Sequence, residues 1–285
     1  MPIEAIQISP QSGSCGALVT GLNLAKDLTS ETLAQVRKAW LDYQVLGFPD
    51  QHLDIPDLER FGLAIGPSGD DPYIKAIPGH AHVVQVRREA DEKTPIFAET
   101  WHTDWSFLKQ PPAGTALYGN IIPPIGGDTL FSNQYAAWDA LSSDLRKDLK
   151  GRLGIHSARN GYSRQGLYGE KDKGRSMAII YDDHAMKTQL HPIARTHPET
   201  GRTALFVSPG YTIGIDGIPD AESRDILIKL FAHQVAPQFI YRHKWSAGML
   251  TLWDNRCLIH AATGGYEGHT RLLHRITIGE RLGTQ

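Results

Sequence analysis

Trp101-His102-Thr103-Asp104 is the stretch of this chain from which its fold and chemistry are best inferred. Together with His260, which lies 156 residues beyond Asp104, it supplies two imidazoles and one carboxylate. Such a set can occupy three adjacent positions of an octahedral Fe(II) ion and leave the opposite face open. His102 and Asp104 are two residues apart, so on an extended strand their side chains project to the same face. The fold must then bring His260 to them from another strand.

The triad admits more than one interpretation. With open positions it is typical of non-haem Fe(II) oxygenases, in which a cosubstrate and dioxygen bind on the free face. A zinc hydrolase is the direct competitor, because zinc accepts the same ligands and also keeps one position open. A non-catalytic metal-binding protein would show the same three residues. The triad alone leaves these alternatives open, and residues outside it are needed to distinguish an oxygenase from a hydrolase or a non-catalytic protein.

Several further motifs follow in a fixed order along the chain. They are Pro111-Pro112-Ala113, Gly126-Gly127-Asp128-Thr129, Trp253-Asp254-Asn255-Arg256, and Arg271 with Arg275. In this order, and with the triad, they resemble the Fe(II)/2-oxoglutarate dioxygenases of the TauD/TfdA family. That family is typified by taurine dioxygenase and the 2,4-dichlorophenoxyacetate dioxygenases. The resemblance extends from about Gly16 to Gly279, nearly the whole chain.

The resemblance implies a role for each matching residue. His102, Asp104 and His260 would bind Fe(II). Arg271 and Thr129 would hold the distal carboxylate of 2-oxoglutarate, a task for which arginine is suited because its planar guanidinium can donate two parallel hydrogen bonds. The implied reaction consumes O₂, hydroxylates a substrate C–H bond and decarboxylates 2-oxoglutarate to succinate and CO₂.

The substrate is expected to be a small organic anion. In the family, the arginine that matches Arg275 holds the anionic head group, and a spacing of four on a strand places it on the face of the cosubstrate arginine. Tyr73 and Lys75 in a neighbouring loop, and Trp105 and Phe107 beside the triad, are expected to contact the substrate. A sulfonate, a sulfate ester, or an aryloxy or alkyl carboxylate would suit such a site.

The chain departs from the taurine enzymes at the positions where they recognise taurine. Tyr73 stands where a sulfonate-binding histidine is expected, and Ala98 stands where a side chain should contact the amine. The runs Val86-Arg87-Arg88-Glu89-Ala90 and Ala221-Glu222-Ser223 instead resemble the aryloxypropionate branch. The sequence therefore favours a substrate other than taurine.

The predicted architecture is mainly β with bracing helices, in a single domain over residues 1–285. Many short strands separated by 28 glycines and 17 prolines indicate a sandwich or a barrel, and the resemblance implies a double-stranded β-helix of the jelly-roll, cupin-like type. Expected strands cover residues 82–87, 115–121, 203–207, 238–241, 249–253 and 272–278. Expected helices begin near Thr29, follow Pro56, and cover 137–149 and 221–233, the last capped by Asp220. Segments 65–79 and 160–187 are expected to be mobile lids over the site.

Composition limits the partners. The formal net charge of −2 gives no reason to expect nucleic acid or an anionic membrane. The chain has two cysteines, too few for a disulfide framework, so a cytoplasmic location is expected and Cys257 is interpreted as a packing residue. We also expect a homo-oligomer, either a dimer or a tetramer.

Overall fold

The computed structural model describes residues 6–281, so the two ends of the predicted 1–285 domain lie outside the described residues. Within that range the chain forms a strand-rich structure with six α-helices. The strands are β1 (Gln7–Pro10), β2 (Ala17–Thr20), β3 (Val45–Phe48), β4 (Ala76–Ile77), β5 (His80–Arg88), β6 (Gly114–Ile121), β7 (Thr129–Asn133), β8 (Leu153–Ser157), β9 (Thr188–Pro192), β10 (Ala194–Thr196), β11 (Thr203–Leu205), β12 (Thr212–Ile215), β13 (Ile240–His243), β14 (Leu250–Asp254), β15 (Leu258–Ala262) and β16 (Arg271–Ile278). The helices are α1 (Ser30–Tyr43), α2 (Ile55–Ile65), α3 (Gln134–Asp139), α4 (Ser143–Leu149), α5 (Arg159–Tyr162) and α6 (Asp220–His233), with 3₁₀ turns η1 (Asp183–Met186) and η2 (Pro237–Phe239). No helix in the described range is long and apolar enough to cross a membrane.

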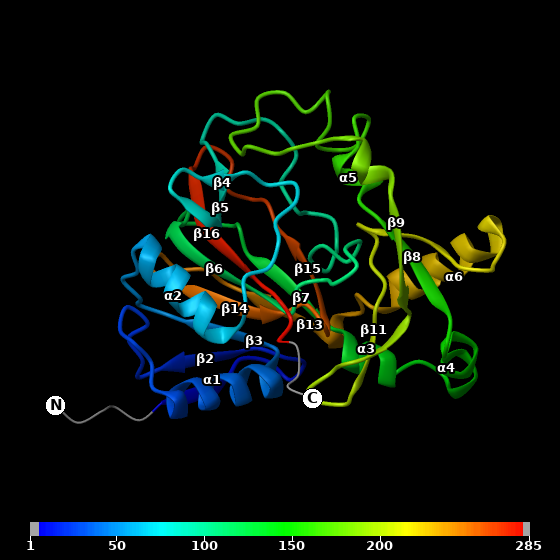
Figure 1. The fold of residues 1–285 in the computed structure, drawn as a ribbon, viewed down its shortest axis with the longest axis horizontal. Coiled ribbons are helices and arrows are strands. Elements are labelled where there is room, and N and C mark those ends of the chain that lie inside the picture. The colour runs from blue at the N-terminus through cyan, green and yellow to red at the C-terminus, as the bar shows by residue number, and fades with distance from the viewer. Residues whose placement is uncertain (1–5, 282–285) are drawn as a thin grey trace.

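Two sheets form the centre of the molecule (Figure 1). The larger has eight strands in the order β1-β2-β3-β14-β6-β16-β5-β4, and the smaller has the order β13-β7-β15. A buried cluster joins them, with Leu117 and Trp253 from the larger sheet and Phe131 and Leu258 from the smaller. Burying this apolar surface from both sides drives the sheets together. The predicted strand-rich architecture is thereby confirmed.

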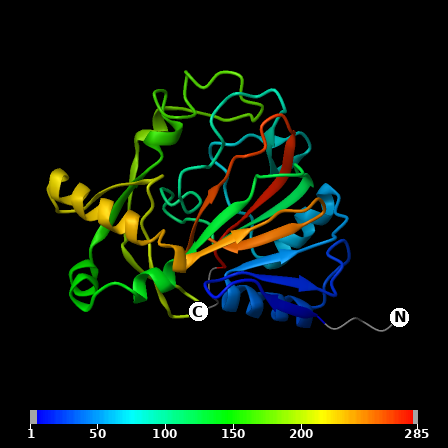
Figure 2. The ribbon, with the colours of Figure 1, turned by 180° about the vertical axis from the view of Figure 1, so that it is seen from behind.

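Helices α1 and α2 cover the outer face of the large sheet (Figures 1 and 2). Trp40 and Phe61 insert from the two helices into one core cluster with sheet residues such as Leu252. Thr29 caps α1 by accepting a hydrogen bond from the Thr32 amide, as its sequence predicts, and Asp54 begins α2 with a capping box. These helices therefore brace the sheet.

A smaller layer lies to one side, where β8, β9 and β12 form a third sheet against α6. Here several predicted boundaries are wrong. The helix expected over 137–149 is two helices, because α3 ends at Asp139 and Ser142 caps a new helix, α4, by accepting a hydrogen bond from the Leu145 amide. Asp220 is the first residue of α6 and makes no capping hydrogen bond, since Pro219 holds the N-cap position.

Two more strand boundaries need correction. Residues 237–239 form a 3₁₀ turn that leads into β13, so the strand predicted over 238–241 begins at Ile240 and runs to His243. The strand predicted over 203–207 ends at Leu205. The other predicted strands agree with the structure to within two residues at each end.

The segments predicted to be lids are both tied to the body of the protein. Segment 65–79 pairs with the end of β16 through hydrogen bonds from the Gly69 amide to Thr277 O and from the Gly279 amide to Pro67 O. Segment 160–187 is held by Glu92, whose carboxylate accepts hydrogen bonds from the amide and the hydroxyl of Ser176. These contacts place both segments beside the sheets.

One glycine shows how tightly the layers meet. A Cβ added at Gly114, at the start of β6, would lie 2.5 Å from the Trp40 ring and 2.9 Å from the Trp253 carbonyl oxygen. The helix and the neighbouring strand therefore leave no room for a side chain there.

We expect Gly114→Ala to lower the free energy of unfolding by about 1–3 kcal/mol, because the methyl group overpacks a contact that includes backbone. Urea unfolding would measure this difference. Gly13→Ala is the matched control, since a Cβ there meets nothing within 4 Å, and it should stay within about 0.5 kcal/mol of the parent. Equal stability of the two variants would contradict this packing argument.

Candidate metal centre

The two histidines of the predicted triad are held by a backbone bridge. The His102 amide donates to His260 O at 3.0 Å, and the His260 amide donates to His102 O at 2.7 Å. Of the two residues, His102 lies in the bridge and Asp104 already begins a turn, so they converge without sharing an extended strand. Trp105, with φ of 45°, bends the chain there, a conformation that a bulky residue rarely adopts.

Three potential ligand atoms converge at this bridge. Asp104 Oδ1 lies 3.6 Å from His102 Nε2 and 3.7 Å from His260 Nε2. All three residues are buried. Ligand atoms in adjacent positions around one ion, each about 2.1 Å from it, are about 3 Å apart, so a small contraction would bring these atoms to coordinating distance.

The protonation of the histidines suits a metal. His102 Nδ1 donates its proton to the Thr100 carbonyl oxygen at 2.7 Å, which leaves the lone pair on Nε2 facing Asp104. Burial, and then the neighbouring His102, lowers the pKa of His260 to about 3, so its ring is neutral. His260 Nδ1 is buried and has no hydrogen-bond partner among the described residues.

A chain of hydrogen bonds orients the carboxylate. Thr115 Oγ1 donates to Asp104 Oδ2 at 2.6 Å and accepts from Asn255 Nδ2 at 3.0 Å. Asn255 is fixed in turn, because its Oδ1 accepts from Trp253 Nε1 and its carbonyl oxygen accepts from Thr103 Oγ1. One oxygen of Asp104 is thus bound, and Oδ1 faces the histidines. The Asn255 of the Trp-Asp-Asn-Arg motif therefore supports the triad from behind.

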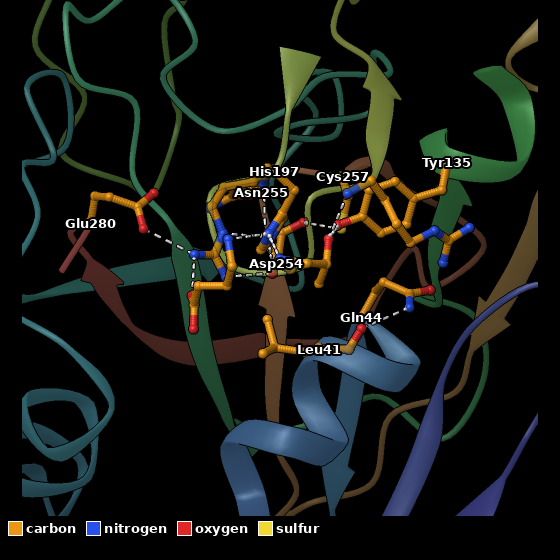
Figure 3. A network of polar contacts seen from close by, with 12 residues as sticks. Leu41, Gln44, Tyr135, His197, Asp254, Asn255, Cys257 and Glu280 are labelled. Atoms are coloured by element: carbon orange, nitrogen blue, oxygen red, sulfur yellow. Dashed lines mark hydrogen bonds and ion pairs between the residues drawn. The ribbon is translucent and has the colours of Figure 1, made fainter. Parts of the chain in front are cut away.

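A second group with metal-ligand chemistry lies near this support. His197, Asp254 and Cys257 are buried, with ligand atoms within 4.8 Å of one another, and Figure 3 shows them around Asp254. Arg256 already occupies both oxygens of Asp254, at 2.8 and 2.6 Å. His197 Nδ1 accepts hydrogen bonds from two backbone amides, so the ring proton is on Nε2. This Nε2–H donates a hydrogen bond to Asp254.

This second group is consequently a structural ion network. Burial by itself would raise the pKa of Asp254, but Arg256 and His197 lower it to about 2. Burial raises the pKa of Cys257 well above its ordinary value, so its sulfur is a thiol. Cys15 and Cys257 are both free and buried in the core between the sheets, which confirms the packing interpretation of Cys257.

The residues predicted to bind the cosubstrate meet across the two sheets. Arg271 begins β16 and Thr129 begins β7, and both line one pocket with the triad. The Arg271 guanidinium lies near the rings of Trp245 and Tyr266 and donates to Gly127 O at 3.2 Å, while its buried Nε has no hydrogen-bond partner within residues 6–281. Thr129 Oγ1 accepts from Trp245 Nε1 at 3.0 Å and keeps its own proton to donate. The pair presents free donors, and the acid that acts on Arg271, Asp128, is itself paired with Arg242.

Arg275 also lines the pocket, but it is not free. Its Nη1 donates to Asp104 Oδ1 at 3.1 Å, its Nε lies 3.2 Å from Asp71 Oδ1, and its buried Nη2 has no partner. Burial alone would raise the pKa of Asp104, but Arg275 and the two histidines hold that pKa well below its ordinary value. The predicted head-group arginine therefore sits between two carboxylates.

The other predicted substrate residues have different positions. Trp105 lines the pocket. Tyr73 and Phe107 lie outside the pocket wall, where Tyr73 packs on Trp105 and Phe107 and stacks on Tyr162 at 4.5 Å between ring centroids. Lys75 is exposed on the far side of the loop and does not line the pocket. Tyr73 thus supports the wall from behind.

The pocket wall contains residues that the sequence did not reveal. Segment 160–187 supplies Tyr162, Leu167 and Tyr168, and the turn before β12 supplies Tyr211. Asp71 and Thr115 were missed as well, although each contacts a site residue. A tyrosine in a polar loop and a threonine in a strand carry no periodic signal, so nothing in the sequence marked them.

Comparisons with known proteins agree with this geometry. The family model described as "Taurine catabolism dioxygenase TauD, TfdA family" matches residues 7–277. A (S)-phenoxypropionate/alpha-ketoglutarate-dioxygenase of Sphingobium herbicidovorans is 32% identical over 261 residues, which cover 91% of this chain and 90% of that protein.

Solved structures resemble the whole chain. A taurine dioxygenase from Burkholderia xenovorans superimposes with a TM-score of 0.80 and 30% identity, covering 97% of this chain and 90% of that one. The structure of AAD-2 in complex with Mn(II) and N-oxalylglycine has a TM-score of 0.79 and 26% identity, covering 99% of this chain and 100% of that one.

We expect Thr115→Val to weaken metal binding by roughly 10- to 100-fold, since it removes the bond that orients Asp104 without changing the side chain's shape. Titration of the metal-free protein with Mn(II) would measure the affinity. Thr251→Val is the matched control, because Thr251 is equally buried on β14 and bonds to His243, away from the triad. Equal Mn(II) affinities of the two variants would contradict the positioning role of Thr115.

Proposed function

Since the chain belongs to the taurine catabolism dioxygenase TauD, TfdA family and is an alpha-ketoglutarate-dependent dioxygenase, we propose that it uses Fe(II) to hydroxylate a small organic anion. Alpha-ketoglutarate is 2-oxoglutarate, the cosubstrate that the sequence predicted. The observation that carries the proposal is the joint occurrence, in one pocket, of the buried triad and an unpaired buried arginine. In this proposal the two central sheets are the double-stranded β-helix of the family.

His102, Asp104 and His260 would hold the ion. Two imidazoles and a carboxylate are the donor set of a facial triad, and the Nε2 atoms of the two buried histidines, which face Asp104 Oδ1, fit this role. When bound, Fe(II) supplies the redox chemistry that activates O₂ and oxidises the oxo acid to succinate. The protein must orient both reactants and keep water out.

Arg271 and Thr129 would anchor the distal carboxylate of 2-oxoglutarate. Desolvating a guanidinium without a partner is costly, so the buried Arg271 is prepared for an anion. The Mn(II) and N-oxalylglycine complex of AAD-2 supports this assignment, because N-oxalylglycine has the 2-oxoglutarate skeleton with NH in place of one CH₂. Arg271 stands at the start of β16, so the anchored end lies away from Arg275.

The substrate would lie between Arg275 and the aromatic wall. Arg275 offers a guanidinium to an anionic head group, and Trp105, Tyr162 and Tyr211 give the rest of the pocket an apolar lining. The similar proteins are named for phenoxypropionate, which has a carboxylate head group, and for taurine, which has a sulfonate head group. A sulfonate, a sulfate ester or an aryloxy carboxylate fits this combination.

Anaerobic titration of the Fe(II) protein with 2-oxoglutarate tests the reaction class. A weak visible charge-transfer band should develop, and Asp104→Ala should abolish it together with succinate formation. Arg271→Ala should need roughly 30- to several-thousand-fold more 2-oxoglutarate, because losing a buried charge pair costs about 2–5 kcal/mol. Arg242→Ala is the matched control, since this half-exposed arginine pairs with Asp128 outside the pocket. A metal hydrolase would show no band, and an unchanged titration in Arg271→Ala would refute the anchor.

Comparing acids with their methyl esters tests the substrate class. The wild type should turn over the acids well and the esters poorly, because an ester provides no anion to pair with Arg275. Arg275→Gln should still bind Fe(II) and 2-oxoglutarate but release succinate without hydroxylated product. Succinate and product would be measured side by side for each pair. Equal coupled turnover of acid and ester would show that Arg275 does not select an anion.

A further inference from the structure

Asp71 is a buried carboxylate that the proposed reaction does not use. It lies in segment 65–79, and its side chain is 9% exposed. Its Oδ1 accepts hydrogen bonds from Thr277 Oγ1 at 2.8 Å and Trp105 Nε1 at 2.9 Å, and it lies 3.2 Å from Arg275 Nε as an ion pair. Burial raises the pKa of Asp71, and Arg275 and the two hydrogen-bond donors oppose that shift. A carboxylate oxygen that accepts two hydrogen bonds and lies against a guanidinium is arranged as an ionised group.

These contacts fix one edge of the head-group arginine. Arg275 Nε lies against Asp71 and also donates to Thr277 Oγ1 at 3.1 Å. The opposite edge carries Nη1, which now faces Asp104, and Nη2, which has no partner. Asp71 does not line the pocket, whereas Arg275 does. Asp71 therefore acts on the pocket through the two lining residues that it contacts, Trp105 and Arg275, and only Arg275 brings a charge to the head group.

Charge balance gives Asp71 a second effect. With a divalent ion and 2-oxoglutarate bound, the ion, Arg271 and Arg275 carry four positive charges. The dianionic cosubstrate, Asp104 and Asp71 carry four negative charges, so the site is neutral before the substrate arrives. A singly charged head group then adds one negative charge, whereas a doubly charged one adds two in a buried site, where like charges repel strongly.

We propose that Asp71 is a specificity-determining residue that fixes Arg275 through Nε and offsets its charge, so that the site accepts a singly charged head group and rejects a doubly charged one. This inference rests on the proposed function, since it assumes that Arg275 receives the substrate anion. It separates sulfonates, sulfate esters and carboxylates from phosphonates and phosphate monoesters. Shape alone would not make that separation, because sulfonate and phosphonate groups are both tetrahedral.

The test is anaerobic binding of two matched probes to the protein loaded with Fe(II) and 2-oxoglutarate. Phenylmethanesulfonate carries one charge, and phenylmethylphosphonate carries two at about pH 8.5, where a phosphorus head group has lost its second proton. The wild type should bind the sulfonate at least about tenfold more tightly. Asp71→Asn keeps the acceptor oxygen but removes the charge, and it should bring the two affinities within about threefold.

Asp70→Asn is the matched control, because it makes the same charge change at the exposed neighbour, and it should keep the wild-type ratio. Equal binding of both probes by the wild type would overturn the proposal without any variant. The proposal would also be overturned if Asp71→Asn kept the wild-type ratio of sulfonate to phosphonate affinity. It would likewise be overturned if the wild type did not bind the sulfonate. The charge-transfer band is recorded on the same samples, so its absence reports failure of the proposed function, and its presence with a wrong ratio reports failure of this inference.

Discussion

The backbones of His102 and His260 bond to each other in both directions, and this bridge brings the two histidines of the triad together. His260 lies on β15 in the small sheet, whereas His102 lies in the loop that joins two strands of the large sheet. The bridge therefore closes the space between the sheets on the side where the pocket opens. Because the histidines are set by backbone bonds and Asp104 by Thr115, the ligands are ordered before an ion arrives, which reduces the entropy cost of binding it.

Two arginines on one face of β16 experience opposite electrostatic conditions. Arg271 is desolvated between aromatic rings, and its Nε is unpaired among the described residues. Its desolvation costs free energy, which a bound anion would offset. Arg275 is paired with Asp104 and Asp71, and these carboxylates hold its pKa above the ordinary value against the effect of burial. One strand therefore holds two arginines four residues apart, one without a carboxylate partner in the described range and one paired with two carboxylates.

The pocket wall depends on segments that the sheets do not order by themselves. Tyr162 and Tyr168 reach the pocket from segment 160–187, and the Tyr168 hydroxyl accepts the amide of Ala98 from the opposite wall. Glu92 holds the same segment through Ser176, inside a cluster of charged groups with Arg88 and Arg175. Removing either group of contacts would open the pocket to water, which a reaction of this kind has to exclude.

The sequence by itself was enough to predict which residues would form the metal ligand set and the cosubstrate pair. His102, Asp104, His260, Arg271 and Thr129 belong to local motifs whose chemistry restricts the residue types, and the structure brings them into one pocket. The strands were predictable for a similar reason, since short apolar runs between glycines and prolines have few alternative conformations.

Only the tertiary structure decided the surroundings of Arg275. Asp71 lies 204 residues before it in a loop without periodicity, and no spacing rule connects the two. Their contact exists because segment 65–79 pairs with the end of β16, and long-range pairing of this kind depends on the packing of whole layers.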